Sequence, residues 1–132
     1  MVLLSNWSLA CSCDETNSVK EELAISDAVF VGKIFSSTQV QIGNYLKNEF
    51  KIEILNLKKG HFSKDTISVY TGISSRDCGV EFEIGEDYII YGVNSFGDIE
   101  FGKGENSIWT YSCLRTKRYN KSEIDEITNE LK

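Results

Sequence analysis

Four cysteines are the residues whose type and spacing say most about the chemistry of this chain: Cys11, Cys13, Cys78 and Cys113. An even number of cysteines in a short chain favours pairing as disulfides. Cys11 and Cys13 are too close in sequence to pair comfortably with each other, so each is expected to bond to a distant partner. Either long-range pairing would close loops of roughly 65 to 100 residues, each worth about 4 kcal/mol when chain entropy alone is considered.

The alternative for the same thiols is a zinc site, with His61 as an additional ligand. Structural zinc sites usually take their cysteines in closely spaced pairs, and neither Cys78 nor Cys113 has another cysteine nearby. His61 follows Lys58-Lys59-Gly60, a sequence typical of an exposed turn, so we expect a solvated side chain rather than a ligand. The sequence therefore favours disulfides, and we expect no metal or other cofactor of the protein's own.

Catalytic patterns are scarce. A single histidine leaves no serine–histidine or cysteine–histidine pair with an evident partner, and no glycine-rich loop joins a strand to a helix in a way that would cradle phosphate. Alternating acids such as Glu81 and Glu83 are more typical of a solvated strand face than of an acid–base pair. We therefore predict that the chain is not an enzyme.

The net charge of −6 disfavours general binding of nucleic acid, because an acidic domain repels the phosphate backbone. One basic cluster stands near the C-terminus, and its members are Arg115, Lys117, Arg118 and Lys121. We interpret it as a solvated loop leading into a charged helix rather than as an anion site. Tyr119 lies beside these cations, and an aromatic residue among basic ones is typical of surfaces that bind single-stranded nucleic acid. The acidic net charge of the chain argues against such a partner.

Residues 1–10 are mostly apolar and carry no charge, and they end in Ser8-Leu9-Ala10 directly before Cys11. Small residues at the first and third positions before a cut are typical of signal peptidase sites. We therefore expect the remnant of an export signal in residues 1–10 and one domain in residues 11–132, secreted or at the cell surface. The alternatives are an ordinary N-terminal extension and a lipid anchor on Cys11. The sequence contains no run close to the about 20 apolar residues of a membrane span.

Helices are expected near both ends of this domain, over residues 16–26 and 121–132. Each contains a serine followed three positions later by an acidic residue, a pattern typical of a capping box: Ser18 with Glu21, and Ser122 with Asp125. The apolar positions expected to face the core are Val19 and Leu23 in the first helix, and Ile124, Ile127 and Leu131 in the second.

The segments between these helices have the composition of strands, expected at residues 27–35, 50–57, 66–70, 88–91 and 99–101. Gly32 within the first strand suggests a bend or bulge. In the second, the apolar positions change phase between Ile54 and Leu55, as a β-bulge would produce. Five strands with flanking helices in a glycine-punctuated chain predict a mainly β fold, a small five-stranded Greek-key barrel of the OB type.

These features together resemble the netrin-like domain, which the N-terminal half of the tissue inhibitors of metalloproteinases shares. The matching motifs, in chain order, are Cys11-Ser12-Cys13, Ser26–Lys33, Cys78-Gly79, Gly85–Ile90 and Cys113–Thr116. The resemblance covers nearly all of residues 11–132. It implies an OB-type barrel with flanking helices, and it implies a pairing of first cysteine with third and second with fourth: Cys11–Cys78 and Cys13–Cys113.

In those inhibitors the free amine and carbonyl of the first cysteine chelate the zinc of a target protease and displace its nucleophilic water. The resemblance assigns this role to Cys11, once cleavage after Ala10 frees its amine. Ser12 would point into the protease's specificity pocket. Cys78 would hold Cys11 in place, and the turn Ser75-Arg76-Asp77 would make a second contact. Cys13 completes the expected inhibitory edge.

The chain departs from those inhibitors in lacking a third disulfide in this domain and the proline-containing stretch after the two N-terminal cysteines. Arg76 and Asp77 are also larger and more charged than the residues usual in that turn. The second functional hypothesis is therefore a non-inhibitory interaction module that binds another extracellular protein.

Overall fold

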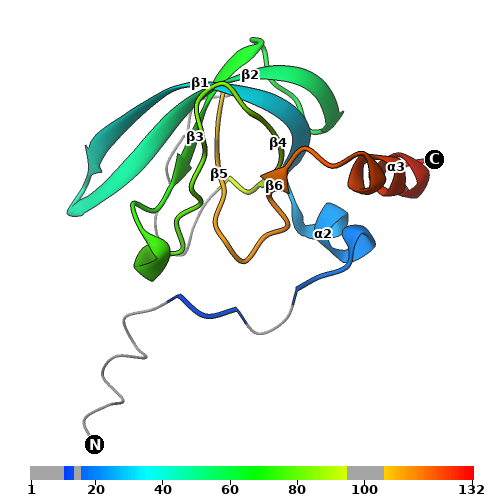
Figure 1. The fold of residues 1–132 in the computed structure, drawn as a ribbon, viewed down its shortest axis with the longest axis horizontal. Helices are drawn as coiled ribbons and strands as arrows, with labels where there is room; N and C mark the ends of the chain where they lie inside the picture. Colours follow the sequence, from blue (N-terminus) through cyan, green and yellow to red (C-terminus); the bar gives the residue numbers. More distant parts are fainter. Residues whose placement is uncertain (1–10, 14–15, 95–105) are drawn as a thin grey trace, which may run out of the picture.

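Six strands and two helices make up the secondary structure of the computed structural model, which describes residues 11–13, 16–94 and 106–132 (Figure 1). The strands are β1 (Ala28–Ile42), β2 (Tyr45–Lys59), β3 (Thr66–Thr71), β4 (Asp87–Gly92), β5 (Ser107–Trp109) and β6 (Lys117–Arg118). The helices are α2 (Val19–Ile25) and α3 (Lys121–Glu130), and a 3₁₀ turn, η1, spans Ser75–Asp77. The prediction of a mainly β domain with a helix near each end is confirmed.

The strands form one mixed sheet in the order β5-β3-β2-β1-β4-β6. Within the described residues it has six strands, of which β1 to β4 lie at predicted positions and β5 and β6 were not predicted. No local pattern marks β6, because its two basic residues become a strand only by pairing with Tyr88 and Ile89 of β4. An antiparallel bridge between Val93 and Trp109 also joins the end of β4 to β5, with N–O distances of 2.8 and 2.9 Å. The strand expected at 99–101 and the expected signal remnant at 1–10 lie outside the described residues.

The β1–β2 hairpin is the largest element and contains the predicted irregularities. Its register shifts between Val31 and Gly32, and on β2 the shift leaves Leu55 as an extra residue, so the bulge expected there is confirmed. A Cβ at Gly32 would collide with the Ile52 side chain, which explains the glycine. Leu55 and Leu57 do not join a core: 47% and 41% of their surfaces are exposed.

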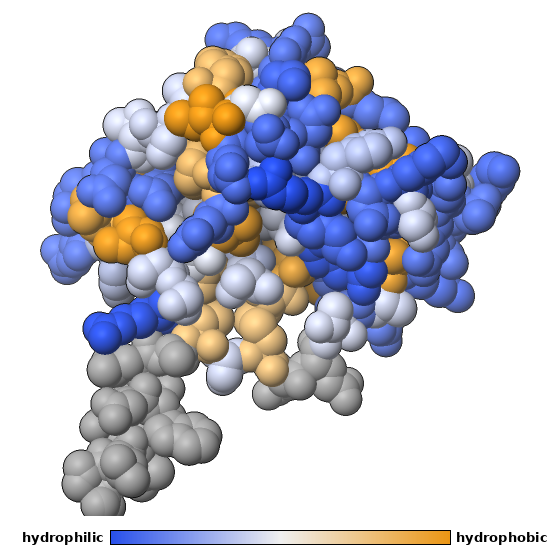
Figure 2. Space-filling view, viewed as in Figure 1, coloured by the Kyte–Doolittle hydropathy of each residue, from blue (hydrophilic) through white to orange (hydrophobic). Residues whose placement is uncertain are grey.

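Apolar side chains form two cores, one on each face of the sheet. The first is built mainly by the strands, and its fully buried members include Phe30, Ile34, Ile52, Val69 and Ile90. The second lies between the sheet and the two helices and includes Val19, Val29, Ile89, Tyr91 and Ile127. On the face of the molecule that Figure 2 shows, hydrophobic groups are scattered among hydrophilic ones. Burial on both faces explains why Tyr88–Tyr91 forms a nearly continuous apolar run.

The helix predictions hold at the first helix and need correction at the last. Ser18 and Glu21 form the expected capping box of α2. Helix α3 is capped by Asn120, whose side chain accepts from the backbone N–H of Glu123, and Ser122 therefore lies inside the first turn. Leu131 is 46% exposed, because it follows the last helical turn rather than lying in the buried stripe. Neither described helix is long and apolar enough to cross a membrane.

Candidate partner-binding edge

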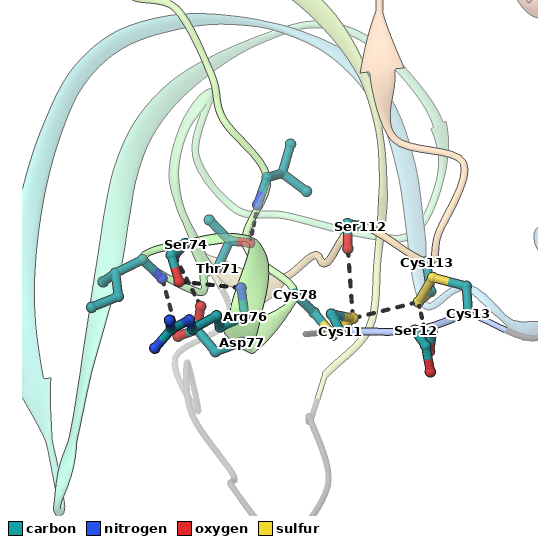
Figure 3. The surroundings of a disulfide bond; sticks show 12 residues. Cys11, Ser12, Cys13, Thr71, Ser74, Arg76, Asp77, Cys78, Ser112 and Cys113 are labelled. Carbon is teal, nitrogen blue, oxygen red and sulfur yellow. Dashed lines mark hydrogen bonds between the residues drawn. A yellow bond between two sulfur atoms is a disulfide. The ribbon is translucent and has the colours of Figure 1, made fainter. Parts of the chain in front are cut away.

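Three segments that are distant in sequence meet at one end of the molecule: residues 11–13, 75–78 and 112–113 (Figure 3). Two disulfides join them, Cys11–Cys78 and Cys13–Cys113, with Cα–Cα separations of 5.1 and 5.4 Å. This is the pairing that the resemblance implies, and it places the described N-terminal segment against the body of the protein. We call these three segments the cysteine edge.

Backbone hydrogen bonds fix Cys11 and Cys78 beyond the covalent link. The Cys11 N–H donates to the Ser75 carbonyl at 3.3 Å, and the Cys78 N–H donates to the same oxygen at 3.4 Å. Cys78 has a left-handed backbone conformation with φ 62°, uncommon for a residue with a Cβ. Its carbonyl accepts from the Ser112 N–H at 2.9 Å. The edge is thus a cross-linked and hydrogen-bonded unit rather than a loose N-terminal strand.

The η1 turn is held by the carboxylate of Asp77, which points into the protein. Its oxygens accept from the backbone N–H groups of Ile73 and Ser74 at 3.1 and 2.9 Å, and from Lys47 Nζ at 3.1 Å. Burial opposes ionisation, but these donors outweigh it and hold the pKa of Asp77 below its ordinary value. The neighbouring Arg76 is exposed. Arg76 therefore faces solvent, while the Asp77 side chain holds the backbone of the turn. The expected contact of this turn with a partner protein stays a prediction.

Lys47 is a component of the edge that the sequence did not reveal. It lies on β2, on the opposite face from Phe50, and only 4% of it is exposed. Its ammonium also lies 5.8 Å from the centre of the Tyr45 ring. An alternating lysine on a strand is normally solvated, and here the distant η1 turn covers it. No signal in the neighbouring sequence could have predicted this burial.

Two glycines permit the segment around η1 to fold back on itself. A Cβ on Gly72 would overlap the Asp77 carboxylate, and a Cβ on Gly79 would overlap the backbone of Gly72. Neither needs an unusual backbone angle, so the requirement is space rather than conformational freedom. At the end of this segment the Thr71 hydroxyl accepts from the Val80 N–H at 3.0 Å (Figure 3).

Arg115, two residues after Cys113, anchors the other half of the edge. Its guanidinium binds the Glu123 carboxylate of α3 through two bonds of 2.8 and 2.5 Å. The same group donates to the Asn17 carbonyl at 2.8 Å, and the Arg115 backbone N–H donates to buried Glu22 at 3.0 Å. The segment after Cys13, helix α2, the segment after Cys113 and helix α3 are therefore connected through one residue, by its side chain and its backbone N–H.

Glu123 is 4% exposed, yet it is ionised. Burial acts to raise its pKa, but Arg115, the Tyr91 hydroxyl at 2.7 Å and Lys117 at 3.2 Å stabilise the charged form and bring the pKa to about 2. Burial, together with the Glu123 charge, raises the pKa of Tyr91. This site is a structural ion cluster, since its carboxylate oxygens are occupied by protein donors.

All four members of the predicted basic cluster have acidic partners. Arg115 and Lys117 bind Glu123, Arg118 binds Glu83 and Glu86, and Lys121 binds Asp125. This pairing agrees with the preference against an anion site. Arg115, however, is half-buried rather than solvated. His61 lies exposed after β2, as predicted.

The outer surface of the edge is accessible. Ser12 and Cys13 are exposed, and a hollow of about 720 Å³ lies beside them. The hollow is lined by Ser12, Cys13, Asn17, Ile25, Tyr111, Cys113 and Leu114. Ser12 and Cys13 therefore form the open side of the edge, while its buried side is held by Lys47, Asp77 and Arg115.

Comparison with known proteins identifies the family. A scan against protein-family models gives no match. The chain is, however, 33% identical over 118 residues to an NTR domain-containing protein of Margaritifera margaritifera, and the alignment covers 83% of this chain and 78% of the relative. The similarity thus extends well beyond the cysteine edge. Identity at this level over most of both sequences shows that the chain belongs to the netrin-like (NTR) domain family.

Proposed function

We propose that this chain is a secreted NTR-domain inhibitor of a zinc metalloprotease, which acts once cleavage after Ala10 has made Cys11 its first residue. The amine and carbonyl of Cys11 would then chelate the protease zinc and displace the water that serves as nucleophile. Ser12 would enter the specificity pocket next to the zinc, and Arg76 would contact the rim beside it.

One observation carries this proposal: Cys11 is immobilised at an accessible edge. Its sulfur is bonded to Cys78, and its nitrogen lies 3.3 Å from the Ser75 carbonyl. A chelating residue that is already ordered loses little conformational entropy on binding, so more of its interaction energy remains as affinity. The adjacent Ser12 is exposed and carries a small side chain that fits a narrow pocket.

The proposal is tested with two proteins that differ by one residue. One begins at Cys11 and the other at Ala10, and both carry the same disulfides. We expect the chain that begins at Cys11 to inhibit at least one member of a panel of zinc endopeptidases at micromolar concentration. The chain that begins at Ala10 should not inhibit, because its Cys11 nitrogen is an amide and cannot chelate. A panel left fully active by both chains would rule out inhibition.

The second hypothesis is a non-inhibitory module that binds another extracellular protein. It is favoured by the Cys11 N–H of the full chain, which is an amide and already donates to Ser75. Intact mass and N-terminal sequencing of the exported protein separate the two hypotheses. A chain that retains residues before Cys11, or carries a lipid there, would remove the chelation mechanism and leave the module.

We further propose that the sheet is an OB-type barrel. The Val93–Trp109 bridge supports this, because it connects β4 to β5 and would close the ring β1-β2-β3-β5-β4. An experimental structure without hydrogen bonds between β4 and β5 would contradict the barrel.

Secretion is supported by the two disulfides, which persist in oxidising compartments. We assign no catalytic role to any residue, since His61 is exposed and Glu123 is occupied by protein donors.

A further inference from the structure

The two disulfides lie in contact with each other. The Sγ atom of Cys11 is 3.8 Å from the Sγ atom of Cys113, although each is bonded to a different partner. Among the described residues, the sulfurs of Cys11, Cys13 and Cys113 all lie within 4.8 Å of one another, and Cys78 is not part of that group. A thiolate formed at Cys113 would therefore be adjacent to the sulfur of the other disulfide without any change of fold.

The two bonds differ in accessibility. Cys13 is exposed, whereas Cys11, Cys78 and Cys113 are half-buried. Both residues of the Cys13–Cys113 bond line the hollow of about 720 Å³, and neither residue of the Cys11–Cys78 bond does. Thiol–disulfide exchange depends on access to the attacked sulfur. A small thiol that enters the hollow therefore has access to the Cys13–Cys113 bond, and attack at Cys13 leaves Cys113 as the thiolate.

We propose that these bonds form an exchange pair, a modification site for low-molecular-weight thiols. The incoming thiolate attacks Cys13 Sγ and forms a mixed disulfide, and the electron pair of the broken bond leaves with Cys113 as a thiolate. The Cys113 thiolate then attacks Cys11 Sγ, forms a Cys11–Cys113 disulfide and releases Cys78 as a thiolate. Each step forms one S–S bond and breaks one, so the sequence needs no oxidant or reductant beyond the thiol itself.

The exchange would change how the cysteine edge is held. Cys11 would be attached to the segment at Cys113 instead of the segment at Cys78, and the η1 turn would lose its covalent link to the N-terminal segment. Lys47 and Asp77 would still hold that turn. This proposal does not depend on protease inhibition, because the chemistry involves only the four cysteines and a thiol.

Two variants isolate the second step. Cys13→Ser leaves the Cys113 thiol beside the Cys11–Cys78 bond, whereas the control Cys11→Ser leaves the Cys78 thiol outside the close sulfur group. Each variant is incubated at pH 8, quenched with acid, alkylated and mapped by peptide mass spectrometry. We expect Cys11 in the first variant to be divided between Cys78 and Cys113. The control should retain Cys13–Cys113 in a larger fraction of chains than the first variant retains Cys11–Cys78, with Cys78 alkylated.

Glutathione added to the native protein supplies a second measurement, which decides the case if a variant fails to fold. The expected product carries glutathione on Cys13, a Cys11–Cys113 bond and an alkylated Cys78. A product with glutathione on Cys13, an intact Cys11–Cys78 bond and an alkylated Cys113 would overturn the proposal. Exclusive Cys11–Cys78 pairing in the folded Cys13→Ser protein would also overturn it, and so would equal scrambling in both variants.

Discussion

At the scale of single residues, the pair Lys47–Asp77 illustrates how a polar contact can determine the shape of the cysteine edge. The Lys47 ammonium is almost fully buried, and the Asp77 side chain is about one-third exposed, at 31%. Removing one member of such a pair leaves the other charge without its partner in a poorly hydrated place. The contact therefore links β2 to the η1 turn more firmly than a surface ion pair would.

We predict that Asp77→Asn destabilises the protein by about 2 to 3 kcal/mol, because Lys47 loses its counter-charge. The matched control is Asp125→Asn, which removes the acid of the exposed Lys121–Asp125 pair and should leave the unfolding midpoint unchanged. Both are measured by denaturant unfolding of the oxidised protein. Equal effects of the two substitutions would show that Lys47–Asp77 behaves as an ordinary surface pair.

At the scale of elements, sequence patterns located most of the secondary structure correctly. The Ser18–Glu21 capping box, the bulge after Ile54 and the strand Tyr88–Tyr91 follow from interactions between residues close in sequence or from the pattern of apolar residues. The wrong prediction of Ser122 as the cap of α3 also came from a local pattern. Asn120 and Ser122 are both good capping residues, and in the structure the Asn120 side chain accepts from the Glu123 N–H.

The capping assignment at α3 is testable by two single substitutions. Asn120→Ala should lower the free energy of unfolding by about 1 kcal/mol, since it removes the side chain that accepts from the Glu123 N–H. Ser122→Ala should have little effect, because Ser122 lies within the helix. Chemical denaturation of the two variants decides the matter, and a larger loss for Ser122→Ala would contradict this structure of the helix start.

At the scale of the whole molecule, two kinds of long-range connection hold the parts together. The disulfides join residues 67 and 100 positions apart. The Arg115–Glu123 cluster joins both helices to the segments that follow Cys13 and Cys113. Both anchor the cysteine edge from the inside and leave its outer surface open to a partner.

The ion cluster predicts a dependence of stability on pH. The pKa of Glu123 falls from an ordinary value near 4.5 to about 2 on folding. A lowered pKa contributes stability above the unfolded value, and that contribution is lost as the pH falls through the folded value. Between pH 5 and pH 2 the native protein should therefore lose roughly 2 to 3 kcal/mol more than Glu123→Gln. Parallel pH curves for the two proteins would show that Glu123 is not responsible.

Reduction should destabilise the domain by several kcal/mol, because the two cross-links close long loops and restrict the unfolded chain. Thermal unfolding with and without a reductant measures this effect, with thiol titration to verify that reduction is complete. An unchanged melting curve in a fully reduced sample would contradict it.

The sequence by itself determined most elements of this protein, and the order of its motifs indicated the family, whose resemblance implied the cysteine pairing. Caps, strand alternation and bulges depend on neighbouring residues, so their energetics are contained in short stretches of chain. The tertiary structure alone decided that Lys47 is buried, that Arg115 joins four segments, and that Cys11 and Cys113 lie 3.8 Å apart. Each of these contacts joins groups that are far apart in sequence. Only the folded chain brings such groups together, and a charge can be buried, or two disulfides placed side by side, only when they are in contact.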